Sequence, residues 1–395
     1  MPTTNATPTT PSAHATVGVP PTDTTLAAAA GKTAELAAES AAAADSDNRL
    51  SPAVAEALVN AGFARHLVGE KWGGSAARPG AVQDLARALA TVGAGCMSAA
   101  WCGGVLAAVG RMCSHLPEEG QHELWGDGPD VPLAGSLAPL GVVREVPGGW
   151  RLSGTWDFAS GVDHAHWTMV GAMVRRADGP PALRHFVLPR RDYTVFDTWR
   201  NVGLRGTGSN SLLVDDVFVP AHRSLEHHAV LTGEPDASAP RLHRVPLKLI
   251  NGLFFVAPGI GAVEGALGAW TEWTANRVEI SGVKTSSRPG VRLTLARAAA
   301  SVDAARLLVE RAATEADDAE VTPGLTLSTT RDYSTAVDLL LNAVNGLLRM
   351  SGARGQAQSS PIQRVWRDVH CMAGHAALQP DVNADAWAKH ALGEE

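Results

Sequence analysis

A change of pattern near Pro129 constrains the fold of this 395-residue chain more than any other feature. From there to residue 222, short segments rich in Val, Leu, Trp and Phe are separated by Gly, Pro and Asp, which is typical of β-strands and turns. Helical patterns occupy the chain on both sides of this block. We therefore expect an α+β protein with four parts: a disordered tail (1–25), an N-terminal helical domain (26–128), a β domain (129–222) and a C-terminal helical bundle (223–395).

The helical parts carry start and stop signals and apolar stripes. Ser51 and Pro52 predict the start of a helix that ends near Gly62, because a hydroxyl caps the first turn and glycine adopts the left-handed conformation after the last. Pro361 predicts the start of a last long helix, which we expect to run through His375. Two apolar stripes at helical spacing predict long helices that pack together: Leu295, Ala298, Val302, Ala305 and Val309, then Ala336, Leu339, Leu340, Ala343, Leu347 and Met350.

Composition and charge exclude several classes of function. A net charge of -7 gives no electrostatic reason to bind nucleic acid, and no apolar run is long enough to span a membrane. The Thr/Pro/Ala-rich N-terminus lacks the charged and apolar regions of a signal peptide. The four cysteines, Cys96, Cys102, Cys113 and Cys371, form no CxxC pair and no zinc-type spacing. We therefore expect free thiols, no bound metal and a cytoplasmic protein.

Two stretches combine β-type residues with small hydroxylated residues, Gly and Trp. They are Gly154–Trp167 (GTWDFASGVDHAHW) and Trp199–Pro220 (WRNVGLRGTGSNSLLVDDVFVP). This combination suits a flat heteroaromatic cofactor that the backbone approaches closely. No segment has the strand, Gly-rich turn, helix and later acidic residue that bind a dinucleotide. A reductive cofactor would therefore have to be recharged by another protein.

The order helical, β, helical, together with SLLVDDVFVP after the middle and RVWRDVH near the end, resembles the acyl-CoA dehydrogenase superfamily. The stretches TWDFASGVDHAHW and GLRGTGSN resemble the oxygenase components of two-component (class D) flavin-dependent monooxygenases. Further runs, INGLFF, AVNGLL and MSGARGQAQSSPIQRVWRDVHCMAGHAALQ, are similar to aromatic polyketide hydroxylases of the actinorhodin type. The resemblance implies an acyl-CoA dehydrogenase-like fold: an N-terminal helical domain, a middle antiparallel β-barrel or sandwich, and a C-terminal four-helix bundle.

The same resemblance implies an activity. A separate NAD(P)H:flavin reductase would supply reduced, diffusible FMN, which reacts with O2 to form a C4a-hydroperoxide. One oxygen atom would then pass to an aromatic polyketide phenol or quinol, in antibiotic biosynthesis. The resemblance also implies a homotetramer.

Individual residues take roles from this resemblance. Ser160 lies where the family places a hydroxyl beside flavin N5, and a hydrogen bond there opposes loss of hydrogen peroxide. His375 lies where relatives carry a His that faces the substrate and handles its hydroxyl proton, with His370 as the second catalytic candidate. The cofactor-binding set is Ser136, Trp156, Phe158, Ser160, Arg205, Thr207, Ser209, Asn210 and Arg277, and the substrate-binding set is Trp101, Asn251 and Phe254.

A purely structural role stays open for most of these residues. Ser160 could cap a turn, and His375 could be a satisfied core imidazole. Trp156 and Phe158 alternate along one predicted strand, so we expect them on one face, where they wall the flavin or pack in the core. Arg277 is expected to reach the flavin phosphate across a subunit interface, or to be an ordinary surface arginine.

Other functions also stay open. An acyl-CoA dehydrogenase would need a catalytic carboxylate, and residues 370–379 contain none. The same flavin chemistry could oxidise nitrogen or sulfur or form an epoxide, and a non-catalytic relative would only bind a ligand. Phenol hydroxylases of the family carry a His about two turns after Trp101, where this chain has Ala108 and Val109. That difference favours a larger, more apolar substrate.

Overall fold

The computed structural model of the chain describes residues 25–176, 179–233 and 238–394. The predicted N-terminal tail lies outside the described residues except for Thr25, whose hydroxyl accepts the Ala28 N–H at 3.3 Å and caps the first helix. The described part of the chain therefore begins with a capped helix turn.

The N-terminal helical domain follows the sequence signals closely. Ser51 accepts the Val54 N–H, Pro52 stands at the first helical position, and Gly62 ends that helix with a φ of 103°. The helices of this domain are α1 (Leu26–Asp47), α2 (Pro52–Ala61), α3 (Ala81–Gly95), α4 (Met97–Cys113) and α5 (Glu118–Trp125). The capping residues thus act as predicted.

The strands of the described residues form a seven-stranded sheet in the order β5-β6-β2-β1-β3-β4-β7. The strands are β1 (Leu133–Val146), β2 (Gly149–Ala159), β3 (Trp167–Val174), β4 (Ala182–Pro189), β5 (Thr194–Phe196), β6 (Asn210–Pro220) and β7 (Ser224–Glu226). Neighbours are antiparallel, as expected, except β1 and β3, which are parallel. The exception arises because the long β1 pairs with β3 through its first half and with β2 through its second, with a register shift between Ser136 and Gly141.

The C-terminal part is a bundle of long helices. Its main members are α9 (Leu253–Asn276), α10 (Pro289–Asp318), α11 (Pro323–Gly355) and α12 (Pro361–Ala373), and the shorter helices are α6 (His227–Thr232), α7 (Arg241–Arg244), α8 (Leu247–Asn251) and α13 (Pro380–Leu392). The predicted stripes are mostly buried here, although Met350 is 36% exposed. The expected length of the last long helix is wrong: α12 ends at Ala373, and His375 has an extended backbone that caps a short 3-10 turn.

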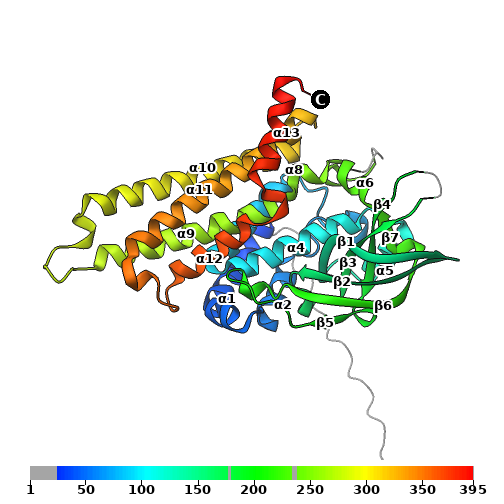
Figure 1. Cartoon of the computed structure of the whole chain (residues 1–395), viewed down its shortest axis with the longest axis horizontal. Coiled ribbons are helices and arrows are strands. Elements are labelled where there is room, and N and C mark those ends of the chain that lie inside the picture. Colours follow the sequence, from blue (N-terminus) through cyan, green and yellow to red (C-terminus); the bar gives the residue numbers. More distant parts are fainter. Residues whose placement is uncertain (1–24, 177–178, 234–237, 395) are drawn as a thin grey trace, which may run out of the picture.

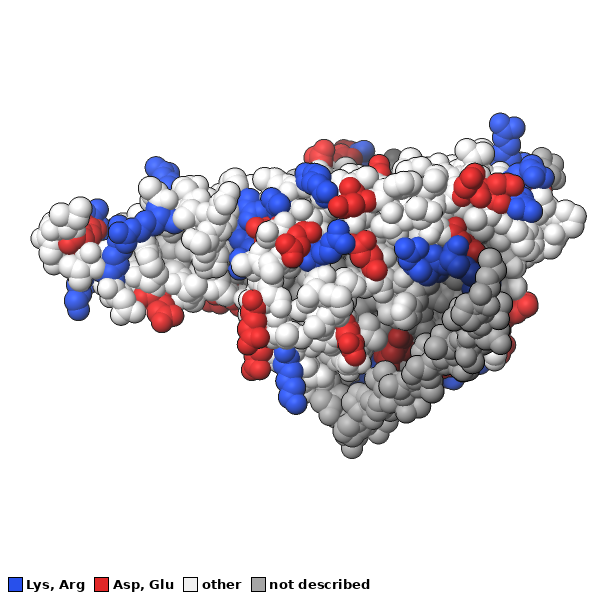
Figure 2. All heavy atoms as spheres, turned by 90° about the horizontal axis from the view of Figure 1, so that it is seen from below, with Lys and Arg blue, Asp and Glu red and all other residues white. Residues whose placement is uncertain are grey.

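Figure 1 shows the bundle extending away from the β domain, with the N-terminal helices between them. Helix α4 packs against both β1 and α9, so it connects the two domains. The segment Leu247–Asn276 is long and apolar enough to cross a membrane, but 72% of its most apolar window is buried in the chain, as in a core helix. On the face in Figure 2, basic and acidic residues are interspersed over the described part of the surface.

Candidate active site

Two segments that are far apart in the sequence meet where β2 ends. Ala159 pairs with Asn210 of β6, and the Gly161 N–H donates to the Thr207 carbonyl at 2.8 Å. Gly161 has a φ of 73°, which turns the chain sharply after Ser160. The turn at Ser160 is therefore held against the turn at Thr207.

Three hydroxyls lie in a row across this junction. The Ser160 Oγ is 2.7 Å from the Ser209 Oγ, which is 2.7 Å from the Thr207 Oγ1. At one end the Trp101 Nε1–H donates to Ser160 at 3.1 Å, and at the other Thr207 donates to the Leu204 carbonyl at 2.7 Å. We call Ser160, Ser209 and Thr207 the hydroxyl array. All three residues are buried.

The expected shared face of Trp156 and Phe158 is wrong, because the register of β2 against β6 shifts between Trp156 and Ala159. Trp156 is fully buried in the β domain, and its Nε1–H reaches the carbonyls of Ala138 and Gly171. It has no surface for a cofactor. Phe158 is 69% exposed, with a φ of 64°, and its ring meets Trp199 edge-on at 6.0 Å.

A cluster of rings lies behind the Trp101 end of the array. Trp101 stacks at 4.7 Å on Phe255 and meets His375 edge-on at 5.6 Å, while Phe255 and His375 are 3.9 Å apart. We call these three residues the ring cluster. Phe254, which the sequence placed in the substrate-binding set, is 1% exposed and packs in the helical core, whereas the side chain of the next residue joins the ring cluster. The substrate contact of Phe254 stays a prediction. Asn251 is half-buried at the end of α8.

The His375 imidazole has a defined protonation state. Its Nδ1 accepts the Ala377 N–H at 3.3 Å. Burial lowers the pKa of His375 to about 4, so the ring is neutral at neutral pH. With Nδ1 accepting, the proton of the neutral ring lies on Nε2.

Several predicted residues lie away from the hydroxyl array. His370 donates from Nδ1 to the Trp366 carbonyl of its own helix and stacks on that indole at 4.3 Å. The Arg205 Nε–H donates to Asn48 Oδ1 at the end of α1, at 3.1 Å. Within this chain both side chains contact neighbouring segments, and the catalytic role of His370 and the cofactor contact of Arg205 stay predictions.

Asn210 also has a structural role. Its Oδ1 accepts the N–H groups of Thr198 and Trp199, and its Nδ2 donates to both oxygens of Asp163. With its amide fully used, Asn210 fixes the loop before β6 and has no group left for a cofactor. Ser136 donates to the Asp157 carbonyl at 2.7 Å and keeps an unused lone pair.

Arg277 closes the far end of α9 and lies over the Trp273 ring at 4.6 Å. Figure 1 places this end of the bundle at the opposite end of the molecule from the β domain. Within a single chain, Arg277 is therefore remote from the hydroxyl array, and the predicted contact with the flavin phosphate would need a second subunit.

Sequence reasoning missed Asp368, which anchors the loop that supports the array. Its Oδ1 accepts the Leu204 N–H at 2.6 Å, and burial raises its pKa to about 7. The loop also presses against α12 at Gly203, where a Cβ would meet the Arg367 carbonyl at 2.1 Å. The available signal was the motif RVWRDVH, whose aspartate lies on the buried face of its helix.

A cavity of about 1200 Å³ opens beside Ser160, between α2, α4 and the segment before β1. Leu58, Leu106 and Trp167 form part of its apolar wall. Ligand pockets usually measure about 300–1000 Å³, so this space has room for a polycyclic molecule. The rings of the ring cluster are not part of its wall, since the described residues that line it include Ser160 but not Trp101 or His375.

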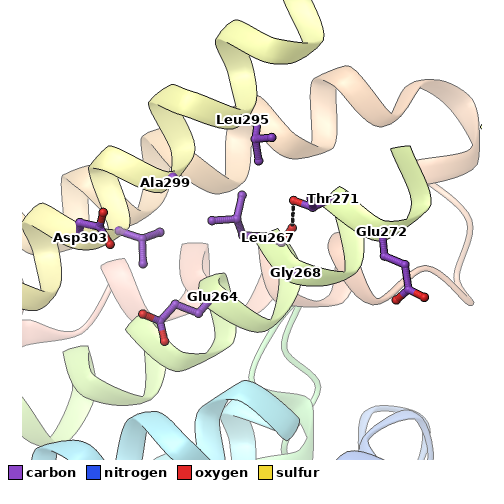
Figure 3. Close-up of a pocket in the computed structure, with 9 residues that line it drawn as sticks. Glu264, Leu267, Gly268, Thr271, Glu272, Leu295, Ala299 and Asp303 are labelled. Carbon is purple, nitrogen blue, oxygen red and sulfur yellow. Dashed lines mark hydrogen bonds between the residues drawn. The ribbon is translucent and has the colours of Figure 1, made fainter. Parts of the chain in front are cut away.

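A second hollow, of about 530 Å³, lies on the outside of the bundle between α9 and α10. Figure 3 shows Leu267 and Leu295 pointing into it from the two helices, with carboxylates at its edges. The Thr271 hydroxyl is already used by the Leu267 carbonyl, at 2.7 Å, and Glu264 is bonded to Arg306. With no aromatic ring in its described lining, this groove suits a flat aromatic ligand less well than the first cavity.

The four cysteines are free thiols, as predicted, and three of them are buried. Among the residues that the structure describes, no group of three or more His, Cys, Asp or Glu side chains could hold a metal ion. Asp163 and His164, which are adjacent in sequence and could be mistaken for metal ligands, have other partners: His164 Nε2 lies 3.0 Å from the Leu50 carbonyl, and Asp163 is bonded to Asn210.

Comparisons with known proteins agree with this architecture. Residues 253–380 match the family described as acyl-CoA dehydrogenase, C-terminal domain. The flavin-dependent monooxygenase, oxygenase subunit HsaA, of Rhodococcus jostii is 34% identical over 350 residues, which cover 86% of this chain and 90% of that protein. The FADH(2)-dependent resorcinol hydroxylase, oxygenase component, of a Rhizobium species is 33% identical over 335 residues, or 80% and 82% of the two chains.

A solved structure of a flavin-binding protein has the same fold. XiaF from a Streptomyces species, in complex with FADH2 and glycerol, superposes with a TM-score of 0.86 at 29% identity, over 94% of this chain and 95% of that one. The fold class and the enzyme class expected from the sequence are therefore confirmed. The chain belongs to the oxygenase subunits of flavin-dependent monooxygenases, which are built on the acyl-CoA dehydrogenase fold.

Proposed function

We propose that the chain accepts reduced flavin from a separate NAD(P)H-dependent reductase and uses O2 to hydroxylate an aromatic polyketide phenol or quinol in antibiotic biosynthesis. The observation that carries this proposal is the buried Ser160 hydroxyl, which the turn at the end of β2 holds at the wall of a cavity large enough for a polycyclic ligand. Relatives named as a resorcinol hydroxylase and a p-hydroxyphenylacetate 3-hydroxylase support an aromatic substrate. The polyketide class rests on the sequence motifs alone.

The residues around Ser160 fit a flavin. Phe158 offers a flat apolar surface, and its positive φ costs about 1 kcal/mol or more, a strain typical of functional sites. Ser136 and Ser160 offer hydroxyl oxygens to the polar edge of a ring. Bound reduced flavin would activate O2 and supply the oxygen atom that is transferred. FMN is the predicted form, while the relatives named above carry FADH2 in their descriptions.

The ring cluster lies behind Ser160, outside the wall of the large cavity, and a substrate ring bound in that cavity would have to reach it past Ser160. Trp101 and Phe255 are 7% and 9% exposed, so the surroundings of His375 are apolar and nearly dry. His375 is the polar group of this cluster, and its Nε2–H can donate to a substrate oxygen. We therefore propose that His375 donates a hydrogen bond to the substrate oxygen, instead of taking up the hydroxyl proton as the sequence suggested. Taking a proton at Nε2 would require the other tautomer, whose Nδ1–H would face the Ala377 N–H.

A dehydrogenase function is less well supported. Removal of an α-proton needs a free carboxylate, and the one that α12 carries close to His375 in sequence, Asp368, is buried and bonded to the Leu204 N–H. Oxidation of nitrogen or sulfur, or epoxide formation, would use the same flavin site and differ only in the substrate. A binding protein without catalysis would have no use for the Ser160 hydroxyl.

Anaerobic titration with photoreduced FMN and FAD tests the proposal. We expect saturable binding of at least one reduced flavin. When O2 is then admitted and a flavin reductase with NAD(P)H supplies reduced flavin, an added polycyclic phenol should be oxidised faster than by the reductase alone. Absence of reduced-flavin binding would contradict the flavin function, whereas binding without product from any phenol or quinol would leave the heteroatom and epoxide alternatives. Light scattering of the same sample tests the expected homotetramer, and cell fractionation tests the cytoplasmic location.

Replacement of Ser160 by Ala tests the hydroxyl. A lost hydrogen bond of about 1 kcal/mol is expected to raise the hydrogen peroxide released per flavin oxidised about fivefold. Ser153, whose hydroxyl accepts the Asp216 N–H elsewhere on β2, provides the matched control. Equal peroxide release from S160A, S153A and the parent protein would remove the role assigned to Ser160.

A further inference from the structure

The hydroxyl array has a direction, which follows from counting its protons. Each hydroxyl has one proton to donate, the indole N–H can only donate, and a carbonyl can only accept. The Thr207 proton must lie toward the Leu204 carbonyl, because two acceptor oxygens at 2.7 Å would otherwise face each other. Ser209 must then donate to Thr207, and Ser160 must donate to Ser209.

This assignment leaves Ser160 with its proton committed. Its oxygen accepts from Trp101, donates to Ser209 and keeps one unused lone pair. At 8% exposure and at the wall of the cavity, this lone pair is the group that Ser160 offers to a ligand. Toward a ligand in the cavity, Ser160 can therefore only accept a hydrogen bond, because its own proton is donated to Ser209.

The far end of the array is anchored. Leu204 carries a φ of 51°, which turns its N–H toward Asp368 Oδ1, at 2.6 Å, while its carbonyl faces Thr207. The same carbonyl also accepts the Trp199 Nε1–H at 3.0 Å, so it cannot turn away from the array without losing two partners. Every donor from Trp101 to Leu204 then points toward the Asp368 end, and successive hydrogen bonds in one direction reinforce each other.

We propose that Thr207 and Ser209 are positioning residues that hold Ser160 as a hydrogen-bond acceptor for the N5–H group of the reduced flavin. This inference rests on the proposed flavin function. An oxidised flavin carries no hydrogen at N5, so an acceptor at this place favours the reduced form. The hydroxyl array thereby favours binding of reduced flavin, which is the form that the reductase would deliver to the enzyme.

Two substitutions at one position separate the hydroxyl from the packing around it. Thr207→Val keeps the shape and removes the hydroxyl, so Ser209 loses its acceptor and can turn its proton back toward Ser160. Thr207→Ser removes a methyl group and keeps the hydroxyl. Ser209→Ala is the second hydroxyl deletion, and it tests the array if T207V does not fold.

The measurement is the 15N chemical shift of N5 in reduced FMN and reduced FAD labelled at that atom, bound anaerobically to each protein. Donation from N5–H moves this signal downfield from its position in free reduced flavin. We expect the parent protein and T207S to share this shift, and T207V and S209A to lose at least half of it. The affinity ratio of reduced to oxidised flavin should fall at least threefold in the same two variants.

Equal N5 shifts in T207V and T207S would overturn the inference, and so would a shift in S209A equal to that of the parent. A loss of thermal stability in T207V without a change of N5 shift would assign Thr207 to packing alone and would also overturn it. Failure of the parent protein to bind either reduced flavin would instead refute the proposed function, and the inference with it.

Discussion

The two ends of helix α4 bury polar side chains in opposite ways. In its N-terminal half, Trp101 donates to Ser160, and each hydroxyl of the array passes its proton to a partner until Leu204 accepts the last one. Every donor in that row is used, and the direction of each hydrogen bond is determined by its neighbours.

At the other end, Arg111 is fully buried without a carboxylate beside it. Its Nε and Nη2 donate to the carbonyls of Leu242 and Val245, but among the described residues its Nη1 and both ring nitrogens of His115 have no hydrogen-bond partner. Burial lowers the pKa of Arg111 to about 10, and burial together with this charge lowers the pKa of His115 to about 3. At neutral pH the arginine is charged and the histidine is neutral.

The two ends of α4 therefore differ in what their buried polar groups do. A buried donor without a partner costs about 1–3 kcal/mol, so the Arg111 end gains stability only from the two carbonyls it holds. The Trp101 end leaves no donor unpaired and presents one directed acceptor to a cavity. One helix therefore holds the segment before α8 with its last turn and the hydroxyl array with its first turns.

The largest effect should come from the Arg111 end. Arg111→Met keeps an apolar stem but leaves the carbonyls of Leu242 and Val245 unsatisfied, so we expect the free energy of unfolding to fall by about 3 kcal/mol in urea titrations. Arg297 is exposed on α10, and R297M should stay within about 0.5 kcal/mol of the parent protein. If R111M is as stable as the parent protein, the free-energy cost of burying the Arg111 charge cancels the gain from its two hydrogen bonds. Arg111 would then not stabilise the segment before α8.

A smaller effect is expected at the Trp101 end, in the ring cluster. His375→Leu removes the Nε2–H donor, and loss of a hydrogen bond of about 1.4 kcal/mol would raise KM for a phenolic substrate about tenfold. His370→Gln is the control in the same region and should leave KM unchanged. Because burial lowers the pKa of His375 to about 4, this residue should not titrate near pH 6.5. The pH profile of kcat/KM should therefore have the same shape near pH 6.5 in the parent protein and in H375L.

The same pKa predicts a pH dependence of stability. Between about pH 4 and the unfolded value of about 6.5, the unfolded chain binds a proton at His375 that the folded chain does not, so this residue makes stability rise with pH. H375L should lose that rise. A rise that persists unchanged in H375L would contradict the lowered pKa of His375. An inflection of kcat/KM near pH 6.5 that disappears in H375L would show that His375 exchanges its proton in the working range.

A second pH dependence is expected at the anchor of the array. Burial raises the pKa of Asp368 to about 7, so the folded chain keeps a proton that the unfolded chain loses above about pH 4. This group therefore makes stability fall as pH rises through that window, by at most about 1.4 kcal/mol per pH unit. Asp368→Asn keeps an acceptor for the Leu204 N–H and should remove the slope, as measured by thermal unfolding from pH 4 to 8. An unchanged slope would show that Asp368 is ionised throughout.

Local signals predicted much of the fold and part of the site. Ser51, Pro52 and Gly62 bound their helix as expected, since capping depends on residues adjacent in sequence. Ser160, Thr207 and Ser209 were chosen from two motifs, and the structure brings them into contact.

Where the sequence predictions differ from the structure, the causes are local changes of backbone geometry that the pattern of residues does not reveal. A register shift in β2 separates Trp156 from Phe158, and the last long helix ends at Ala373 instead of continuing through His375. A change of one residue in phase decides whether a phenylalanine packs in the core or joins the ring cluster, as the two at the start of α9 show.

By itself, the sequence determined the order of the elements, their caps and the supply of hydroxyls and rings, because these depend on residue type and on spacing within a few turns. The tertiary structure alone decided that the hydroxyl array runs from Trp101 to Leu204, that Asp368 anchors it, and that Ser160 accepts. The direction of a hydrogen bond depends on which partners have protons left to give. Here those partners come from α4, β2, the loop before β6 and α12, which only the folded chain brings together.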